Sequence, residues 1–159
     1  MTNKQKILKD LKEKFEELKK ELKFKATYEQ INSISYIEDM ALTAGYVSNQ
    51  FSRQMINRMV ETYYSWVAQM GVWINPPPYD IITMSEVKQL NQDEKKEINE
   101  MISRIMYLVR KCKRIAFDGL KKEEESLFID ELVEFDKKYF NTFMLKYHKK
   151  FEELWGEND

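Results

Sequence analysis

The stretch from Gly45 to Trp73 most constrains the fold of this chain. It reads GYVSNQFSRQMINRMVETYYSWVAQMGVW and holds only three charged side chains, whereas Asp, Glu, Lys and Arg make up 33% of the whole sequence. Arg53, Arg58 and Glu61 interrupt it at short intervals, so it lacks the about 20 consecutive apolar residues that a membrane-spanning helix needs. We therefore interpret it as the central helix of a helical core.

Apolar and small residues recur through this region at steps of three and four, which is the period of an α-helix. In the second half they cover about half of the helical circumference, so this helix should contact at least two others. The pattern predicts a continuous helix as far as residue 73, with any bend at Gly45. Its seam consists of Ile37, Ala41, Gly45, Ser48, Ser52, Met55, Met59, Tyr63, Trp66, Met70 and Trp73.

Three further helices follow from the same spacing. They cover residues 2–22, 91–118 and 124–155, and capping boxes at Thr2 and Asn91 mark the first two starts. The central helix begins at a box formed by Thr27 and Gln30 or at one formed by Ser35 and Glu38. The seams are Leu8, Leu11, Phe15, Leu18 and Leu22; Ile98, Ile102, Ile105, Val109, Cys112 and Ala116; and Phe128, Leu132, Phe135, Tyr139, Phe143, Tyr147, Phe151 and Leu154.

Chain breakers are few and stand at the predicted helix ends. The chain has four glycines and three prolines, and the prolines are consecutive at 76–78. They end the central helix, because proline lacks the amide donor, and Gly119 is placed to end the helix over 91–118. In the connection after the prolines, Thr83 with Glu86 predicts one short helix. The sequence thus predicts an all-α fold, an antiparallel bundle of four main helices with one short extra helix after Pro76–Pro78, in a single domain over residues 1–159.

Charge and cysteine usage favour a cytoplasmic protein without a membrane segment. Basic residues number 26 and acidic residues 27, so the chain has no overall attraction to nucleic acid or anionic lipid. Cys112 is the only cysteine, which excludes an intramolecular disulfide and fits a reducing compartment. The charged N-terminal residues contain no apolar segment for export.

No catalytic constellation, metal site or cofactor motif is evident. His148 is the only histidine, and Leu145 stands three residues before it, so the Glu-x-x-His pattern of di-iron bundles is missing. Cys112 lies at a seam position, where a free cysteine behaves as a small buried hydrophobe. We therefore predict a non-catalytic protein with no cofactor.

A basic cluster on the helix over 91–118 is the one candidate binding patch. Lysine and arginine near a helix C-terminus are favoured by the helix dipole, which gives the cluster a purely structural explanation. As a functional patch it would bind an anion or the acidic surface of a partner. Its residues are Arg104, Arg110, Lys111, Lys113 and Arg114.

Three functions stay open on this evidence. The first is a protein–protein interaction or accessory subunit, whose partner is another protein or a second copy of the chain. The second is association with nucleic acid through the basic cluster over 104–114, and the third is a small-molecule site or enzyme site inside the bundle. The last rests on the small residues at Ala41, Ala44, Gly45, Ser48 and Ser52, which either admit a packed helix or leave room for a ligand.

Overall fold

The computed structural model describes residues 1–156 and confirms the all-α class, since no strand occurs in that range. A π-helical turn, η1, joins the last two helices. The elements are α1 (Asn3–Leu22), α2 (Tyr28–Ser35), α3 (Ile37–Ala44), α4 (Phe51–Tyr64), α5 (Val67–Ile74), α6 (Ile81–Val87), α7 (Gln92–Phe117), α8 (Lys122–Phe135), η1 (Asp136–Phe140) and α9 (Asn141–Gly156).

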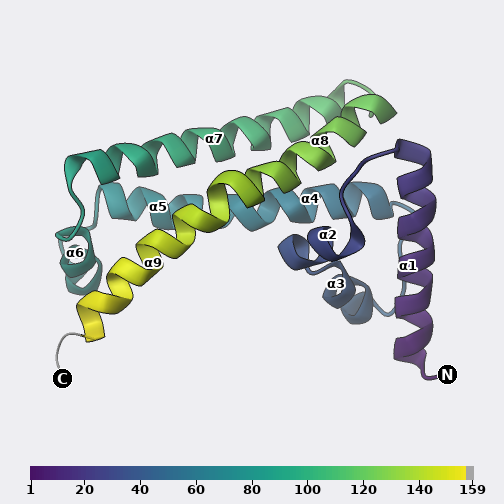
Figure 1. The fold of residues 1–159 in the computed structure, drawn as a ribbon, viewed down its shortest axis with the longest axis horizontal. Coiled ribbons are helices and arrows are strands. Elements are labelled where there is room, and N and C mark those ends of the chain that lie inside the picture. Colours follow the sequence, from purple (N-terminus) through teal and green to yellow (C-terminus); the bar gives the residue numbers. More distant parts are fainter. Residues whose placement is uncertain (157–159) are drawn as a thin grey trace.

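The long helices form two groups that cross each other (Figure 1). Helices α4 and α5 run beside α7 along the long axis, and the α8–η1–α9 rod crosses them obliquely. Helix α1 runs across the other long helices at one end and packs on α3 and α8, while α6 closes the opposite end beside α5. The N-terminal helix is therefore a cross-piece, which differs from its predicted place as an antiparallel member of the bundle.

The predicted continuous helix over 37–73 is wrong, because the chain breaks into α3, α4 and α5. Tyr36 and Gly45 both adopt the left-handed conformation, with φ of 52° and 82°, and each ends a helix. A further turn at Ser65 and Trp66 separates α4 from α5. Gly45 was placed correctly as the point of change, since a positive φ costs glycine little. The helix ends at Ala44 and the next one begins at Phe51, so the chain is interrupted at Gly45 and is more than bent there.

Local signals at the other helix ends are confirmed. Thr2, Thr27 and Asn91 each accept a hydrogen bond from the backbone N–H three residues on, and the side chain at that position bonds back to the cap. The Thr27 box therefore starts α2, and Ser35 instead donates its hydroxyl to the Ile31 carbonyl. Gly119, with φ of 89°, lies in the turn after α7 as predicted.

The short helix after the prolines begins three residues earlier than the Thr83 cap predicts. Asp80 is the N-cap of α6, and its carboxylate accepts hydrogen bonds from the Thr83 N–H at 3.0 Å and the Thr83 hydroxyl at 2.6 Å. Thr83 is thus the capped residue. An ionised carboxylate is the better acceptor at a helix N-terminus, because the helix dipole favours negative charge there.

The last rod contains a π-turn that the sequence analysis did not predict. Between Phe135 and Phe140 the buried face advances by five residues, so Phe140 is 7% exposed and Tyr139 is 46% exposed. Tyr139 was placed in the seam, and that prediction is wrong. The buried hydroxyl of Tyr63 donates to the Leu132 carbonyl at 3.3 Å and to Asp136 at 3.4 Å, beside the turn.

One apolar core connects these elements. Met55, Met59 and Tyr63 of α4 are fully buried, as is Met70 of α5, and Trp73 is 2% exposed. The three-and-four spacing therefore identified the core-facing side of this region correctly, although it did not reveal where the helix is interrupted.

Candidate functional site

The structure separates the five predicted basic residues onto different sides of α7. Arg104 stacks on the Tyr139 ring, with 4.2 Å from the guanidinium carbon to the ring centre. Lys111 pairs with Glu131 of α8, and Arg114 pairs with Glu124 at 3.0 Å. These three cations interact within the fold and do not form a common patch with the other two.

Arg110 and Lys113 face a hollow between α4 and α7, which we call the α4–α7 hollow. Its volume is about 520 Å³. Arg53 of α4 joins them there, although it was not among the five residues predicted for the patch. The lining residues are Arg53, Asn57, Val60, Glu61, Tyr64, Met106, Val109, Arg110, Cys112, Lys113, Ala116 and Phe117.

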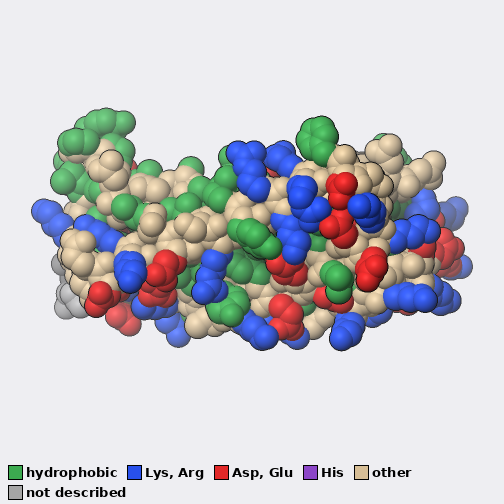
Figure 2. Space-filling model, turned by 90° about the horizontal axis from the view of Figure 1, so that it is seen from above, with side chains coloured by type: hydrophobic (Ala, Val, Ile, Leu, Met, Phe, Trp, Pro, Cys, Tyr) green, Lys and Arg blue, Asp and Glu red, His purple; other side chains and the backbone are tan. Residues whose placement is uncertain are grey.

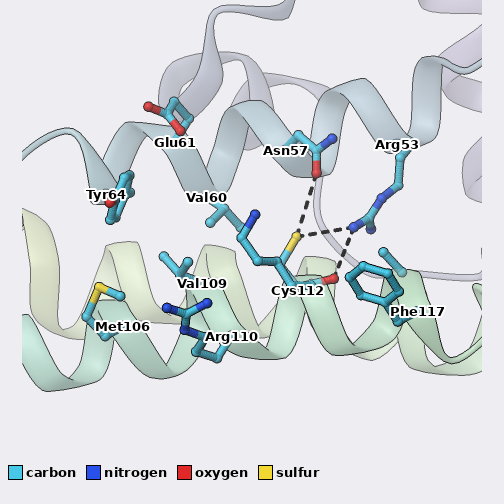
Figure 3. A pocket seen from close by; sticks show the side chains of 12 residues that line it. Arg53, Asn57, Val60, Glu61, Tyr64, Met106, Val109, Arg110, Cys112 and Phe117 are labelled. Atoms are coloured by element: carbon cyan, nitrogen blue, oxygen red, sulfur yellow. Dashed lines mark hydrogen bonds between the residues drawn. The ribbon is translucent and has the colours of Figure 1, made fainter.

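Hydrogen bonds fix the side chains at one end of this hollow (Figure 3). The Arg53 Nη2 group donates to the Cys112 carbonyl at 3.0 Å and lies 3.5 Å from the Cys112 sulfur. The Cys112 thiol points toward the Asn57 side-chain oxygen at 3.7 Å. The thiol is 4% exposed, which agrees with its predicted seam position, and the arginine is held with a fixed orientation.

The other Arg53 nitrogen gives the site an unsatisfied donor. Nη1 of Arg53 is buried and has no hydrogen-bond partner among residues 1–156. Glu125, 6% exposed at the start of α8, lies near this guanidinium. Burial raises the pKa of Glu125, and the attraction of Arg53 offsets that effect only in part. A buried, unpartnered donor is uncommon and often marks a functional or incompletely filled site.

Charge on the α7 face is mixed. Figure 2 shows Lys and Arg side chains gathered over the middle of this face, with Asp and Glu side chains among them. Within residues 1–156, no ion pair joins Arg110 or Lys113 to a carboxylate, in contrast to Lys111 and Arg114. The uncompensated positive charge of this part of α7 therefore lies on the side of the hollow.

A second surface feature is an apolar projection formed by Pro78, Tyr79, Ile81 and Ile82, which we call the 78–82 projection. Tyr79 is 86% exposed, Ile81 77% and Ile82 65%. Figure 2 shows apolar side chains standing out at the end of the molecule that carries α6. This surface was not among the predicted binding sites.

The backbone of the projection is ordered by local hydrogen bonds. Asp80 N–H donates to the Pro77 carbonyl at 3.1 Å and closes a turn with Pro78 and Tyr79 at its centre. Proline suits the first central position of such a turn because its φ is already fixed. With Asp80 also capping α6, the three large apolar side chains project from a well-defined scaffold.

A second hollow lies on the other side of α7, against α8 and the π-turn. Its volume is about 630 Å³, and the exposed rings of Tyr107 and Tyr139 line it together with Arg104 and Lys138. The carboxylates of Glu131 and Glu134 line the same hollow and pair with Lys111 and Lys138. The local charges are thus balanced, and this hollow offers less electrostatic selectivity than the α4–α7 hollow.

Neither a metal site nor a membrane span emerges from the described residues. Within 1–156, no three His, Cys, Asp or Glu side chains gather as metal ligands. Over the same residues, every helix is too short or too polar to cross a bilayer. Comparisons of the chain with models of protein families, with curated proteins and with solved structures found no match.

Proposed function

We propose that this protein is a non-catalytic interaction protein, an accessory subunit that binds another protein through the 78–82 projection. The observation that carries the proposal is the exposure of Tyr79, Ile81 and Ile82, three large apolar side chains within four residues. Single exposed apolar residues are ordinary on protein surfaces, whereas contiguous ones mark interaction sites.

Preorganisation of the backbone supports this proposal. The turn at Pro78 and the Asp80 cap hold the projection in one conformation, so binding would order few additional groups. Covering each exposed isoleucine would contribute about 1 to 2 kcal/mol, and a tyrosine adds a large ring with one hydrogen-bonding group. A cluster of this kind has the composition of an interface hot spot.

The chemistry of the projection indicates the partner surface. Asp80 is the one charged residue between Pro78 and Ile82, and its carboxylate is directed to Thr83 at the start of α6. The complementary surface is therefore an apolar recess on another protein, with a polar group for the Tyr79 hydroxyl. A charged groove would leave its own groups unpaired against these isoleucines.

Site-specific photo-crosslinking in the native cell tests the proposal. A photoreactive phenylalanine analogue replaces Tyr79 in one version of the chain and Leu127 of α8, itself 65% exposed, in the control. We expect one adduct of defined mass from position 79 that is missing from position 127. The substitutions Ile81→Ser and Ile82→Ser together should abolish it, while Leu145→Ser with Tyr46→Ser should not.

The mass of the adduct separates the alternatives. An adduct of twice the chain mass would show that the projection binds a second copy, which overturns the proposal of a different partner. The same weak adducts at both positions, or none at position 79, would also overturn it. An adduct to nucleic acid would favour the alternative in which the protein associates with nucleic acid.

A further inference from the structure

We propose that the α4–α7 hollow binds a small organic phosphate that carries a flat ring. This site lies on α4 and α7, apart from the 78–82 projection, and the inference does not depend on the proposed protein partner. It rests on the charge of the lining residues, on the geometry of Arg53 and on two exposed aromatic rings.

The charge of the hollow matches a phosphate monoester. Arg53, Arg110 and Lys113 supply three positive charges, and Glu61 is the one carboxylate in the lining. Glu125 lies near Arg53 but outside the lining and offsets part of its charge, so Arg110 and Lys113, which have no ion pair within residues 1–156, supply the two positive charges that remain. A phosphate monoester carries about −1.5 to −2 at neutral pH. The match is thus closer for a phosphate than for a single carboxylate.

The three cations come together because of helical spacing. Arg110 and Lys113 are three residues apart on α7 and occupy neighbouring positions on one face. Arg53 reaches the same hollow from the first turn of α4, and Figure 3 shows Glu61 toward the opposite end from Arg53. The carboxylate is therefore placed away from the guanidinium that would hold the anion.

Arg53 lies beside the hollow and has one donor without a partner within residues 1–156. Its Nη2 group bonds the Cys112 carbonyl, which fixes the guanidinium plane, and its Nη1 group is buried without a partner. Because Nη1 is covered, the guanidinium must turn toward the hollow to reach a phosphate oxygen, and the phosphate then replaces its bond to the Cys112 carbonyl. Arginine suits this role because its planar fork can donate two hydrogen bonds to one phosphate.

Aromatic and aliphatic side chains also line the hollow and suit a ring. Phe117 is 93% exposed and Tyr64 is 45% exposed, and both line the hollow with Val60 and Met106. Aromatic side chains stack on flat heterocycles and contribute about 1 to 3 kcal/mol for each stacked base in single-stranded nucleic-acid complexes. The volume of about 520 Å³ is that of a small-molecule pocket, and a polymer would need a longer positive track.

Calorimetric titration of the full chain with four probes tests the proposal. The probes are AMP, phenyl phosphate, adenosine and inorganic phosphate. We expect AMP and phenyl phosphate to bind, and adenosine and inorganic phosphate to bind at least about tenfold more weakly, since each lacks one of the two recognised groups. Amide shifts in the NMR spectrum should change mainly in residues 53–64 and 106–117.

Paired variants assign the binding to the hollow. Arg110→Gln with Lys113→Gln should weaken AMP binding at least about tenfold, because two charge-assisted contacts are lost. The matched control is Arg104→Gln with Lys96→Gln, which removes two exposed cations of α7 that do not line the hollow and should change AMP binding less than about twofold. All four positions are exposed, and circular dichroism verifies that both variants fold.

Three results would overturn the proposal. The first is no binding of AMP and phenyl phosphate at millimolar concentration. The second is an equal loss of AMP affinity in the two double variants, which would indicate general electrostatic attraction. The third is tighter binding of a mixed-sequence oligonucleotide than of AMP with the same loss in both variants, which would indicate a nucleic-acid surface.

Discussion

Glu125 shows what burial does to a single carboxyl group. Burial raises its pKa, so the folded protein favours the protonated form more than the unfolded chain does. Stability from this group is present below the pKa of the unfolded carboxyl and is lost as pH rises through the folded pKa. We predict that Glu125→Gln stabilises the protein at pH 7 and that this gain disappears at acidic pH.

Urea unfolding at several pH values measures this difference. Glu123→Gln, on the same first turn of α8 but exposed, serves as the matched control and should give no gain at pH 7. The Glu123→Gln substitution removes a negative charge from the N-terminus of α8, where the helix dipole favours negative charge. A Glu125→Gln variant less stable than the natural chain at pH 7 would mean that attraction to Arg53 outweighs burial.

Tyr63 is the second residue for which the contacts give a definite expectation. Its ring is fully buried against Phe135 and Phe140, and its hydroxyl donates to the Leu132 carbonyl and to Asp136. Tyr63→Phe keeps the ring and removes the donor, which should cost about 1 to 2 kcal/mol of unfolding free energy. Tyr46→Phe, at a position that is 64% exposed, should change it little. Equal effects at the two sites in urea unfolding would contradict the assigned role of the hydroxyl.

At the scale of elements, Lys150 joins α9 to the first turn of α7. Its amino group contacts both oxygens of Glu94 at 2.7 and 2.8 Å, and Glu94 also bonds the Asn91 N–H in the capping box. Burial alone would raise the pKa of Glu94, but these hydrogen bonds outweigh it and hold the pKa below its ordinary value. The pair therefore contributes stability above the pKa of an unfolded glutamate, and this stability is lost as pH falls through the folded pKa.

Replacing Lys150 should expose this contribution. Lys150→Met leaves the 8% exposed Glu94 without its cation and should destabilise the fold by about 1 to 2 kcal/mol at neutral pH. Lys149→Met removes the exposed neighbouring charge and should cost little. The difference in stability between the Lys150→Met and Lys149→Met variants, measured by thermal unfolding, should become smaller as the pH is lowered. A stability difference that grows at low pH would show that the pKa of Glu94 is not lowered in the folded protein.

The π-turn at η1 behaves as one extra residue in an otherwise regular helix. Deleting the exposed Lys137 would change the five-residue step between Phe135 and Phe140 into a helical step of four and keep both buried faces aligned. We predict that this deletion preserves cooperative folding.

Deleting Glu100 from the regular helix α7 is the control. It should rotate Ile105 and Leu108 out of the core and abolish folding, since burial of each side chain is worth about 1.5 to 3 kcal/mol. Thermal melting followed by circular dichroism compares the folding of the two deletion variants. An equal loss of stability in both would contradict the assignment of the π-turn as one extra residue.

These elements show what could be read from the sequence. Caps at Thr2 and Asn91 and the stop at Gly119 depend on neighbouring residues only, so they were predicted correctly. The breaks at Tyr36 and Ser65 were missed because each following helix resumes with its apolar face toward the core, which preserves the three-and-four spacing. The break at Gly45 had a local signal, and the left-handed Tyr36 did not.

The candidate site was predictable only in part, because it depends on contacts between helices that are distant in the sequence. The basic residues of α7 were identified, but their separation into three groups depends on what α4, α8 and the π-turn place beside them. Arg53 gave no signal of its own, because its role comes from packing against Cys112, which lies far away in the sequence. The 78–82 projection could have been found from its run of exposed apolar residues directly after three prolines.

At the scale of the whole molecule, the three tryptophans allow a test of whether the chain is one cooperative unit. Trp66 lies at the turn before α5, Trp73 in α5 and Trp155 in α9. These elements lie away from the cross-piece α1 (Figure 1). At the other end, the fully buried Phe15 of α1 packs edge-on against Phe24 and Tyr28, at 5.6 and 5.3 Å between ring centres.

Phe15→Ala should lower the unfolding free energy by about 3 to 5 kcal/mol, because it leaves a cavity in a continuous core. If the core is one unit, tryptophan fluorescence and far-ultraviolet circular dichroism should shift to the same lower urea midpoint, although the tryptophans are remote from the substitution. Glu16→Ala, exposed on the same helix, should leave both midpoints unchanged. An early loss of helical signal with an unchanged fluorescence midpoint would show that α1 to α3 unfold separately, and the chain would then comprise two folding units.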